Sequence, residues 1–444
     1  MKKINYSGKD FVLSLQHMFA MLGATILVPI LSNMNISIAL IAAGLGTMAF
    51  YFIAQKKVPV FLGSSFAFLP SYIAILGTAG LIGSPTWNTA MGGLAVALVL
   101  TGLVYLLFAF IVKKIGVEKI KQIFPTIVIG PVVILIGLIL APKMLYNNIV
   151  ANYVSGGSSA FNEWSCAIIT ALVIIIINAF TKQKSFLRVM PIIIGFTVGY
   201  LYGAAIGLVN LDGVFSGQIF VFQNLNTYLG FYGSLNINWS IILSIMPIAI
   251  VSIMEHLGDI SANSIICGKD FIKDPGLHRT LTGDGVATMI AGALGGPANT
   301  TYGENTAVLA LTKNYNPRNI FIAACLTVLF GIFTPFAEFL TSIPPAVIGG
   351  ASIVLFGMIA SSGLRGLIEA RVDLSNSKNL IISTLILSVG LGLGALSLIG
   401  DVTGNTAYKI MVGGIEMSPL FVATVLGIFL NLVLPNEKPK ETNA

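Results

Sequence analysis

The chain alternates between long uncharged stretches and short clusters of charged residues. No Asp, Glu, Lys or Arg occurs from Phe11 to Gln55, or from Val58 to Val112. A helix that crosses a bilayer needs about 20 apolar residues, so each of these stretches must hold more than one crossing. Turn signals rich in Asn, Gly and Pro, at residues 33–35 and 83–85, mark where the chain folds back. The pattern predicts an all-α polytopic membrane protein.

This pattern predicts about fourteen transmembrane helices. Their approximate centres lie near residues 22, 45, 70, 100, 132, 172, 199, 248, 288, 306, 328, 352, 389 and 426. The ninth and tenth spans are the least regular, because glycine and polar residues interrupt them.

Composition supports the membrane assignment, and the placement of charge predicts the topology. Of the 444 residues, 56% are hydrophobic and 9% are charged, whereas about a quarter are charged in soluble proteins. All basic residues except Lys143 and Lys409 fall on one side of the predicted spans. Positive residues stay cytoplasmic, so we expect both termini inside and an even number of spans. The net charge of +7 therefore reflects topology and does not indicate nucleic-acid binding.

Sequence motifs for other chemistries are missing. Cys166, Cys267 and Cys325 form neither a disulfide framework nor a metal-ligand spacing. The sequence contains no HExxH or G-x-S-x-G motif, so we expect no enzyme activity, no metal ion and no cofactor. The first residues resemble a signal peptide, but the apolar run continues to Leu31, which favours an uncleaved first helix.

Two halves of the chain share short matches at a common offset. Leu15-Gln16-His17 matches Met254-Glu255-His256, and the same offset carries Ser65 onto Glu304. Seven spans per half is an odd number, so the second half is expected to be inverted in the membrane. Inverted repeats with paired broken segments place a transporter's substrate site near the midplane, between the two breaks. Chance similarity and ordinary helix kinks are the alternative interpretation.

The two matching segments near residues 59–70 and 295–303 are both broken by Gly and Pro. A break frees backbone N–H and C=O groups, which is tolerated at membrane depth only where protein or a cavity covers them. Phe66–Phe68 and Asn299–Tyr302 favour an extended backbone. We therefore expect short strands that lie against each other at these breaks.

Three acidic residues are exceptional, because most of the others lie in loops beside basic residues. These are Glu255, Asp259 and Glu304. Glu255 and Asp259 are four residues apart, so they share one helix face. A charge at the bilayer centre costs about 2.5–3.5 kcal/mol, and two adjacent carboxylates there favour binding a proton. The alternative is that the acids brace the helix bundle, and His17 and His256 are either proton shuttles or packing residues.

Several motifs resemble the nucleobase–ascorbate transporters, and within them the bacterial uracil permeases. The resemblance covers almost the whole chain and is carried by Ser14–Thr25 (SLQHMFAMLGAT), Leu62–Phe68 (LGSSFAF), Asp274–Arg279 (DPGLHR), Asn299–Asn305 (NTTYGEN) and Ala360–Arg365 (ASSGLR).

This resemblance implies a fold and a location. It implies a 7+7 inverted repeat with short antiparallel strands in the broken third and tenth spans. A core domain, residues 1–121 and 213–342, would move against a gate domain, residues 122–212 and 343–444. The protein would be a multi-pass protein of the bacterial cytoplasmic membrane, with a homodimer as a plausible assembly.

The resemblance also implies roles for individual residues. Glu255 and Glu304 are similar to the two acids that hold uracil, Phe66 to the aromatic residue beside the ring, and Ala24 and Gly303 to positions that offer backbone contacts. Supporting positions are Gln16, His17, Ser65, Asn305 and Thr312. Proton coupling falls to Glu255, Asp259 and His256, although a relative carries His in place of Asp259, which leaves its role open.

The residues alone agree with a nucleobase as substrate. Uracil is neutral and planar, with two N–H donors and two carbonyl acceptors, so carboxylates and freed amides complement it. A co-transported proton would contribute about 2.3 kcal/mol per 100 mV of membrane potential. The leading hypothesis is proton-coupled uracil import. Xanthine or another nucleobase is the nearest alternative, followed by an anion carrier or channel on the same architecture.

Overall fold

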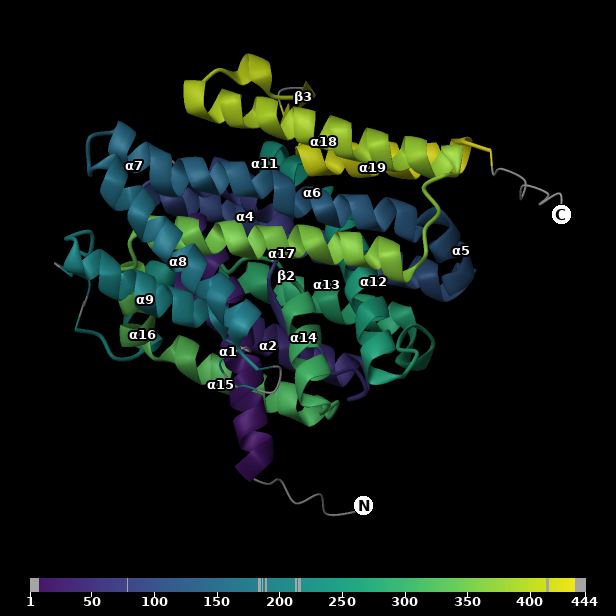
Figure 1. Cartoon of the computed structure of the whole chain (residues 1–444), viewed down its shortest axis with the longest axis horizontal. Coiled ribbons are helices and arrows are strands. Elements are labelled where there is room, and N and C mark those ends of the chain that lie inside the picture. Colours follow the sequence, from purple (N-terminus) through teal and green to yellow (C-terminus); the bar gives the residue numbers. More distant parts are fainter. Residues whose placement is uncertain are drawn as a thin grey trace.

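The computed structural model describes residues 8–77, 79–182, 185, 187, 190–211, 214, 217–412 and 415–435, without the side chains of Lys9, Glu304 and Ala307. Its described part is mostly helical (Figure 1). Eight helices are long and apolar enough to cross a membrane, and four shorter apolar helices accompany them. The chain is therefore a multi-pass membrane protein.

The helices before residue 212 are α1 (Gly8–Leu31), α2 (Ile36–Ile53), η1 (Phe66–Phe68), α3 (Leu69–Leu76), α4 (Pro85–Ile115), α5 (Val117–Ile123), α6 (Thr126–Leu145), η2 (Tyr146–Val150), α7 (Ala151–Val154), α8 (Ala160–Phe180) and α9 (Pro191–Ala205). Those that follow are η4 (Val221–Asn224), α10 (Leu225–Tyr228), η5 (Gly230–Ser234), α11 (Trp239–Ile245), α12 (Ile248–Cys267), η6 (Ile272–Gly276), α13 (Leu277–Leu294), α14 (Gly303–Thr312), α15 (Pro317–Ile332), α16 (Thr334–Thr341), α17 (Pro345–Glu369), α18 (Ser377–Thr403), η7 (Thr406–Tyr408) and α19 (Pro419–Val433). The strands are β1 (Leu62–Ser64), β2 (Asn299–Thr301), β3 (Met411–Val412) and β4 (Ile415–Glu416).

The two predicted turns are helix starts. Asn35 accepts a hydrogen bond from the Ile38 amide at 2.9 Å, and Ser84 accepts one from the Trp87 amide at 3.3 Å. Both side chains satisfy an amide that has no partner in the first helical turn. Pro85 follows Ser84 at the first position of α4, where a missing N–H costs nothing.

Paired glycines allow the long helices to approach closely. A Cβ on Gly102 of α4 would lie 2.6 Å from the carbonyl oxygen of Gly285 in α13, and one on Gly285 would lie 2.9 Å from the Gly102 oxygen. Gly130 of α6 and Gly363 of α17 face each other in the same way, at 3.2 and 2.6 Å. Small residues at such crossings let backbones pack without a polar partner in lipid.

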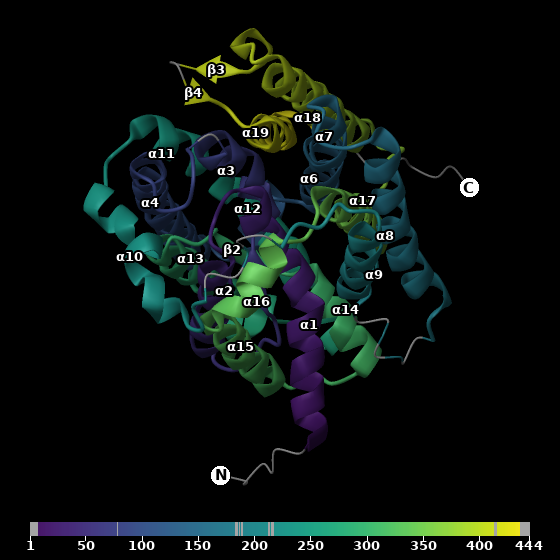
Figure 2. The ribbon, with the colours of Figure 1, turned by 90° about the vertical axis from the view of Figure 1, so that its left-hand side faces the viewer.

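Helix contacts fall into two groups. In one, α13 packs on α4 and α2, and α2 and α1 pack on α15. In the other, α17 packs on α6 and α8, α8 on α9, and α18 on α6 and α19. Figure 2 shows α18 and α19 together at the top, with α8 and α9 beside α17.

Strands β1 and β2 pair antiparallel although 235 residues or more separate them in sequence. Leu62 lies opposite Thr301, and Ser64 opposite Asn299. The ladder continues through the Ser65 amide, which donates to the Ala298 carbonyl at 2.8 Å. The expectation of an extended backbone at Phe66–Phe68 is wrong, because this segment is the 3-10 helix η1. The ladder stops at Ala298, whose amide donates to the Tyr72 hydroxyl at 2.9 Å and not to the Ser65 carbonyl.

The two basic residues that break the charge pattern share one acidic partner. Asp401, at the end of α18, lies 2.5 Å from Lys143 Nζ and 2.6 Å from Lys409 Nζ. Lys409 also pairs with Glu416 at 2.9 Å. Burial alone would lower the pKa of Lys409, but its bonds to Asp401 and Glu416 raise the pKa above its ordinary value of 10.5.

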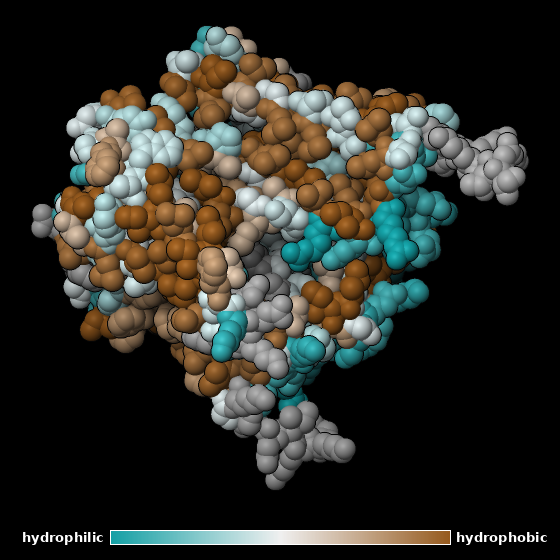
Figure 3. All heavy atoms as spheres, viewed as in Figure 1, coloured by the Kyte–Doolittle hydropathy of each residue, from teal (hydrophilic) through white to brown (hydrophobic). Residues whose placement is uncertain are grey.

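The surface is divided into apolar and charged regions, as the sequence is divided into uncharged stretches and charged clusters. Hydrophobic residues cover much of the left and upper part of the face drawn in Figure 3, whereas hydrophilic residues gather at the edge where α5 lies in Figure 1. The exposed Lys119 and Lys121 belong to α5. An apolar belt with charged edges is the surface that a bilayer requires.

Candidate functional site

The two short helices α3 and α14 each begin beside the β1–β2 pair. The chain enters α3 through β1 and η1, and it enters α14 through β2 and Tyr302. Helices α1 and α12 pack against these segments, since α1 contacts β1 and α14, and α12 contacts β2, η1 and α14. Figure 1 shows β2 near the centre of the molecule, between α17 and α2. The continuous η1–α3 segment and α14 therefore both start at this point, and the first amides of a helix have no partner within it.

A proline in α1 helps to hold β1 in place. Pro29 lies inside α1 and has no N–H to donate to the Thr25 carbonyl four residues earlier. The Ser64 hydroxyl of β1 donates to that carbonyl at 3.1 Å. Ala24, next to Thr25, is fully buried at this contact. The backbone around Ala24 is thus fixed against the break.

The Asp259 carboxylate lies at the start of α14. Its Oδ2 accepts a hydrogen bond from the Thr301 hydroxyl at 3.0 Å. Its Oδ1 would lie 3.3 Å from a Cβ on Gly303, the first residue of α14. A negative charge is favourable at a helix N-terminus, where amides without partners point outwards. Gly303 is itself exposed, so its backbone is accessible from outside the packed bundle.

One stripe of α12 is partly accessible, whereas its neighbours are buried. Glu255, Gly258, Asp259 and Ala262 are half-buried and follow the i, i+3, i+4, i+7 spacing of one helix face. A Cβ on Gly258 would lie 3.6 Å from Ile129 of α6, so this stripe faces α6. The sequence prediction that Glu255 and Asp259 share a face agrees with this geometry. The stripe exposes carboxylates along a face that is otherwise packed.

A buried polar network joins α1, α14 and α12. The Asn305 amide group donates to the Pro59 carbonyl at 2.9 Å, which orients its Oδ1 towards His17 Nδ1 at 2.7 Å. Asn263 of α12 donates to the same Pro59 carbonyl at 3.2 Å. His17 therefore carries its proton on Nδ1 in this arrangement. The network positions α14 relative to the two longer helices.

Several buried polar atoms around the break have no hydrogen-bond partner among the described residues. They are Gln16 Oε1, His17 Nε2, Ser65 Oγ and Thr306 Oγ1. Leaving such atoms unpaired costs about 1–3 kcal/mol each. Their presence on α1, after β1 and on α14 is what a site for a polar ligand requires.

Phe66 stands at the boundary between the two groups of helices. It is almost fully buried, and its ring centroid lies 5.4 Å from that of Phe356 in α17, with the planes nearly perpendicular. Aromatic rings favour such edge-to-face pairs. Phe66 therefore links the broken segment to α17.

Two of the predicted site residues contribute no described side chain at the break. The backbone of Glu304 is the second residue of α14, but its side chain lies outside the described part of the structure. Thr312 is the last residue of α14, where its hydroxyl donates to the Val308 carbonyl at 2.9 Å. Nine residues of helix, about 13 Å, separate it from Gly303. The structure does not bring Thr312 to the break.

His256 points away from the Glu255 stripe. It is fully buried, and its Nε2 lies 2.9 Å from the Thr280 hydroxyl, which donates to the Leu277 carbonyl. Its Nδ1 lies 2.9 Å from Oδ2 of Asp284 in α13, which is also fully buried. Any exchange of protons between His256 and Glu255 would have to pass across the helix.

Sequence reasoning missed Asp284. It is not among the three acids singled out from the sequence, whereas the structure buries it in the middle of α13. A signal was present in the sequence, since Asp284 and Glu304 are the two charged residues between Arg279 and Lys313. An acid isolated in such a stretch has no nearby basic residue to pair with in a loop.

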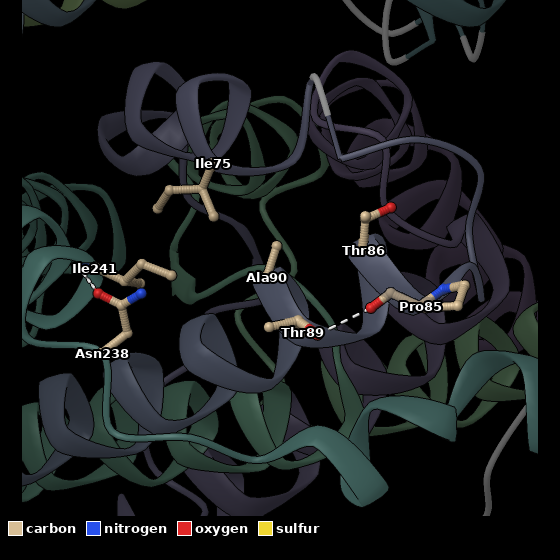
Figure 4. Close-up of a pocket in the computed structure, with 7 residues that line it drawn as sticks. All are labelled: Ile75, Pro85, Thr86, Thr89, Ala90, Asn238 and Ile241. Atoms are coloured by element: carbon tan, nitrogen blue, oxygen red, sulfur yellow. Dashed lines mark hydrogen bonds between the residues drawn. The ribbon is translucent and has the colours of Figure 1, made fainter.

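A separate cavity of about 530 Å³ lies between α3, α4 and α11 (Figure 4). Its polar groups are already bonded, because Thr89 donates to the Pro85 carbonyl and Asn238 accepts from the Ile241 amide. None of the predicted site residues lines it. Among the described residues, no cluster of three or more His, Cys, Asp or Glu side chains is placed to hold a metal ion.

Taken together, a multi-pass bundle, two broken segments that meet at paired strands and an accessible carboxylate stripe define a membrane transporter. The model of the Permease family matches residues 8–399. The chain belongs to this family, the nucleobase–ascorbate transporters, whose members are permeases and not enzymes.

Relatives cover nearly the whole chain. The uracil permease of Bacillus caldolyticus is 39% identical over 98% of this chain and 94% of its own length. That of Bacillus subtilis (strain 168) is 37% identical over 100% and 98%. The uracil permease of Escherichia coli (strain K12) is 35% identical over 95% and 90%.

Solved structures share the fold at low sequence identity. The transmembrane domain of the cyanobacterial bicarbonate transporter BicA has a TM-score of 0.58 at 12% identity, with 96% of both chains covered. The murine anion transporter Slc26a9 has a TM-score of 0.64 at 10% identity, covering 98% of this chain and 69% of that one. These similarities concern the fold alone.

Proposed function

We propose that this chain imports uracil across the bacterial cytoplasmic membrane, coupled to protons, by alternating access. The observation that carries the proposal is the half-buried Glu255–Asp259 stripe beside the start of α14. The relatives that cover nearly the whole chain, named as uracil permeases, support uracil as the substrate.

Recognition would use complementary hydrogen bonds. Uracil offers two N–H donors, which the Glu255 and Glu304 carboxylates would accept, and two carbonyl acceptors. Backbone groups at Ala24 and Gly303 would complete the polar contacts, because the start of α14 has amides without helical partners. Phe66 would lie against the ring face. Gln16, His17, Ser65 and Asn305 would support this arrangement.

The proposed architecture is a 7+7 inverted repeat of fourteen spans with both termini cytoplasmic. In it, residues 1–121 and 213–342 form the core domain, and residues 122–212 and 343–444 form the gate domain. The close packing of α4 with α13, and of α6 with α17, supports two bodies of this composition. The Phe66–Phe356 contact would then join core to gate. A homodimer is part of the proposal.

Proton coupling would allow a neutral substrate to be concentrated. Uracil gains nothing from the membrane potential, whereas a proton contributes about 2.3 kcal/mol per 100 mV. Glu255 would bind that proton, since it shares its face with Asp259, and neighbouring carboxylates disfavour double ionisation. Asp259 would modulate the step. His256 would act at most indirectly, through the helix that it shares with Glu255.

A pH-jump uptake assay tests the proposal. Full-length protein in liposomes receives labelled uracil with an inward proton gradient, and unlabelled uracil, thymine and xanthine compete. We expect gradient-dependent accumulation that uracil inhibits most strongly. Inhibition by xanthine equal to or better than that by uracil would overturn the substrate assignment, and steady current without substrate would indicate a channel.

Glu304→Ala provides the matched binding test. Removal of the charged acceptor should abolish uracil binding, because the buried N–H donor of the base would lose its partner. The substitution Glu338→Ala in α16 removes an acid outside the proposed site and serves as the control. Normal affinity of Glu304→Ala would exclude Glu304 from the site.

A further inference from the structure

An apolar groove of about 470 Å³ runs along the side of the molecule between α4 and α19. Ile250 of α12 and Phe124, just before α6, complete its lining. The full set of lining residues is Val104, Leu107, Phe108, Ile111, Phe124, Ile250, Val425, Ile428, Phe429 and Leu432. Every one of them has an apolar side chain.

The groove is built from two helix stripes. Residues 104, 107, 108 and 111 of α4, and residues 425, 428, 429 and 432 of α19, each follow the spacing of one helix face. The α4 stripe continues to Lys114, seven residues after Leu107. Lys114 lies three residues after Ile111, which corresponds to a rise of about 4.5 Å along the helix axis. The apolar stripe thus leads directly to a basic residue.

Positive charge accumulates at the end of α4 and along α5, the segments that follow the α4 stripe. Lys113, Lys114, Lys119 and Lys121 are all exposed, whereas Glu118 is the one acid between Val112 and Phe124. Glu118 lies 3.8 Å from Lys121. Within the part of the chain that the structure describes, no carboxylate forms an ion pair with the other three lysines. Three basic groups therefore remain for an external anion.

We propose that this groove binds an anionic phospholipid, with an acyl chain along the α4 and α19 stripes and the phosphate at Lys113 and Lys114. An apolar channel with adjacent cations matches a molecule that has a long hydrocarbon chain attached to an anionic head. A zwitterionic lipid would fill the channel equally well, but its head group has no net negative charge to pair with the lysines. The Lys114 ammonium lies 5.6 Å from the centroid of the Phe110 ring, one turn earlier on α4.

The groove crosses the boundary between the proposed core and gate domains. Its lining comes from α4 and α12 on one side and from α19 and Phe124 on the other. A bound lipid therefore touches both bodies, and relative motion would change the groove. This consequence rests on the proposed division into domains, whereas lipid binding itself does not.

Lipid binding by purified full-length protein tests the proposal without uracil. Phosphatidylglycerol and phosphatidylcholine with identical acyl chains compete for the protein in detergent, with native mass spectrometry as the readout. Each lysine near a membrane surface strengthens anionic lipid binding about fivefold, so we expect a preference of roughly 25-fold for phosphatidylglycerol. The double variant Lys113→Gln/Lys114→Gln should bring the two lipids close to parity.

Two further variants separate the charge from the groove. Lys182→Gln removes an exposed lysine that follows α8, and it should retain the wild-type preference. Leu107→Trp fills the groove, and it should weaken binding of both lipids at this site while leaving the lysines in place. Equal binding of the two lipids by the wild type, retained preference in the double lysine variant, or equal loss in Lys182→Gln would each overturn the proposal.

Discussion

The Oδ2 atom of Asp284 in α13 lies 2.9 Å from Nδ1 of His256 in α12, and neither side chain is exposed. Because Thr280 occupies the other ring nitrogen at 2.9 Å, both nitrogens of His256 face partners on α13. The imidazole next to Glu255 in sequence is therefore a link between two helices. Disrupting such a buried pair costs stability, because removal of one partner leaves the other buried without its partner.

Asp284→Asn and His256→Asn should each destabilise the protein, by about 3–5 kcal/mol. The two side chains lie 2.9 Å apart, with no other ion pair between the described residues of α12 and α13, so the double variant should cost clearly less than the sum of the single ones. Thermal unfolding of the purified protein in detergent measures all three. Thr280→Val, which removes the contact to Nε2 together with the hydroxyl's bond to the Leu277 carbonyl, is the control and should cost about 1–2 kcal/mol. Strictly additive single effects would argue against a direct coupling.

Glu255→Gln should separate binding from accumulation. Glutamine resembles the protonated acid but cannot release a proton, so the variant should exchange uracil across the membrane without concentrating it. Counterflow of labelled uracil measures exchange, and uptake under a proton gradient measures accumulation. Accumulation at the wild-type level would exclude Glu255 as the coupling group.

Substitutions of Asp259 and Thr301 distinguish a role of Asp259 in proton coupling from a role in bracing the start of α14. Asp259→Asn removes a titratable group, whereas Thr301→Val removes only the hydroxyl that bonds to it at 3.0 Å. If Asp259 takes part in coupling, its variant changes the pH profile of uptake and Thr301→Val does not. Identical pH profiles for the wild type and both variants would indicate that Asp259 only braces the start of α14.

Lys409 should stabilise the protein up to strongly alkaline pH. Its pKa in the folded protein is raised above 10.5, so its stabilising ion pairs are complete below that pH and are lost as the pH rises through the folded pKa. Lys409→Gln should cost about 1–2 kcal/mol, because the cluster is only partly buried. The difference in thermal stability between wild type and variant should stay constant from about pH 7 to 9 and shrink above the ordinary lysine pKa.

If the stability difference between the wild type and Lys409→Gln vanished already near pH 9, the ion pairs of Lys409 would not be its cause. Lys182→Gln is the matched control, because Lys182 is exposed and forms no ion pair with the described residues. Its substitution should leave thermal stability unchanged over the same pH range.

The sequence predicted the helices well where the signal is local. Hydrophobic stretches of the required length mark the long spans, and Asn35 and Ser84 act as helix caps where the turn residues indicated a reversal. The relation between Glu255 and Asp259 followed from their spacing of four residues, which needs only helix geometry.

Prediction failed where the cause lies far away in sequence. The aromatic residues of Phe66–Phe68 favour a strand, yet the segment is helical, and the Ala298 amide opposite it donates to the distant Tyr72 hydroxyl instead of continuing the ladder. Asp284 is explained by His256, which lies on another helix. The partial exposure of the α12 stripe likewise depends on its distance from Ile129 of α6. Local patterns in a single sequence do not reveal such contacts between residues that are far apart along the chain.

The β1–β2 ladder restricts how the protein turns over. Backbone bonds fasten Leu62–Ser64 to Asn299–Thr301, so α3 and α14 cannot part without tearing the sheet. Under the proposed alternating access, the substrate would instead pass along the flank of α12 that faces α6. Fastening the two strands together with a disulfide should then leave turnover intact, whereas locking Gly258 to Ile129 should arrest it.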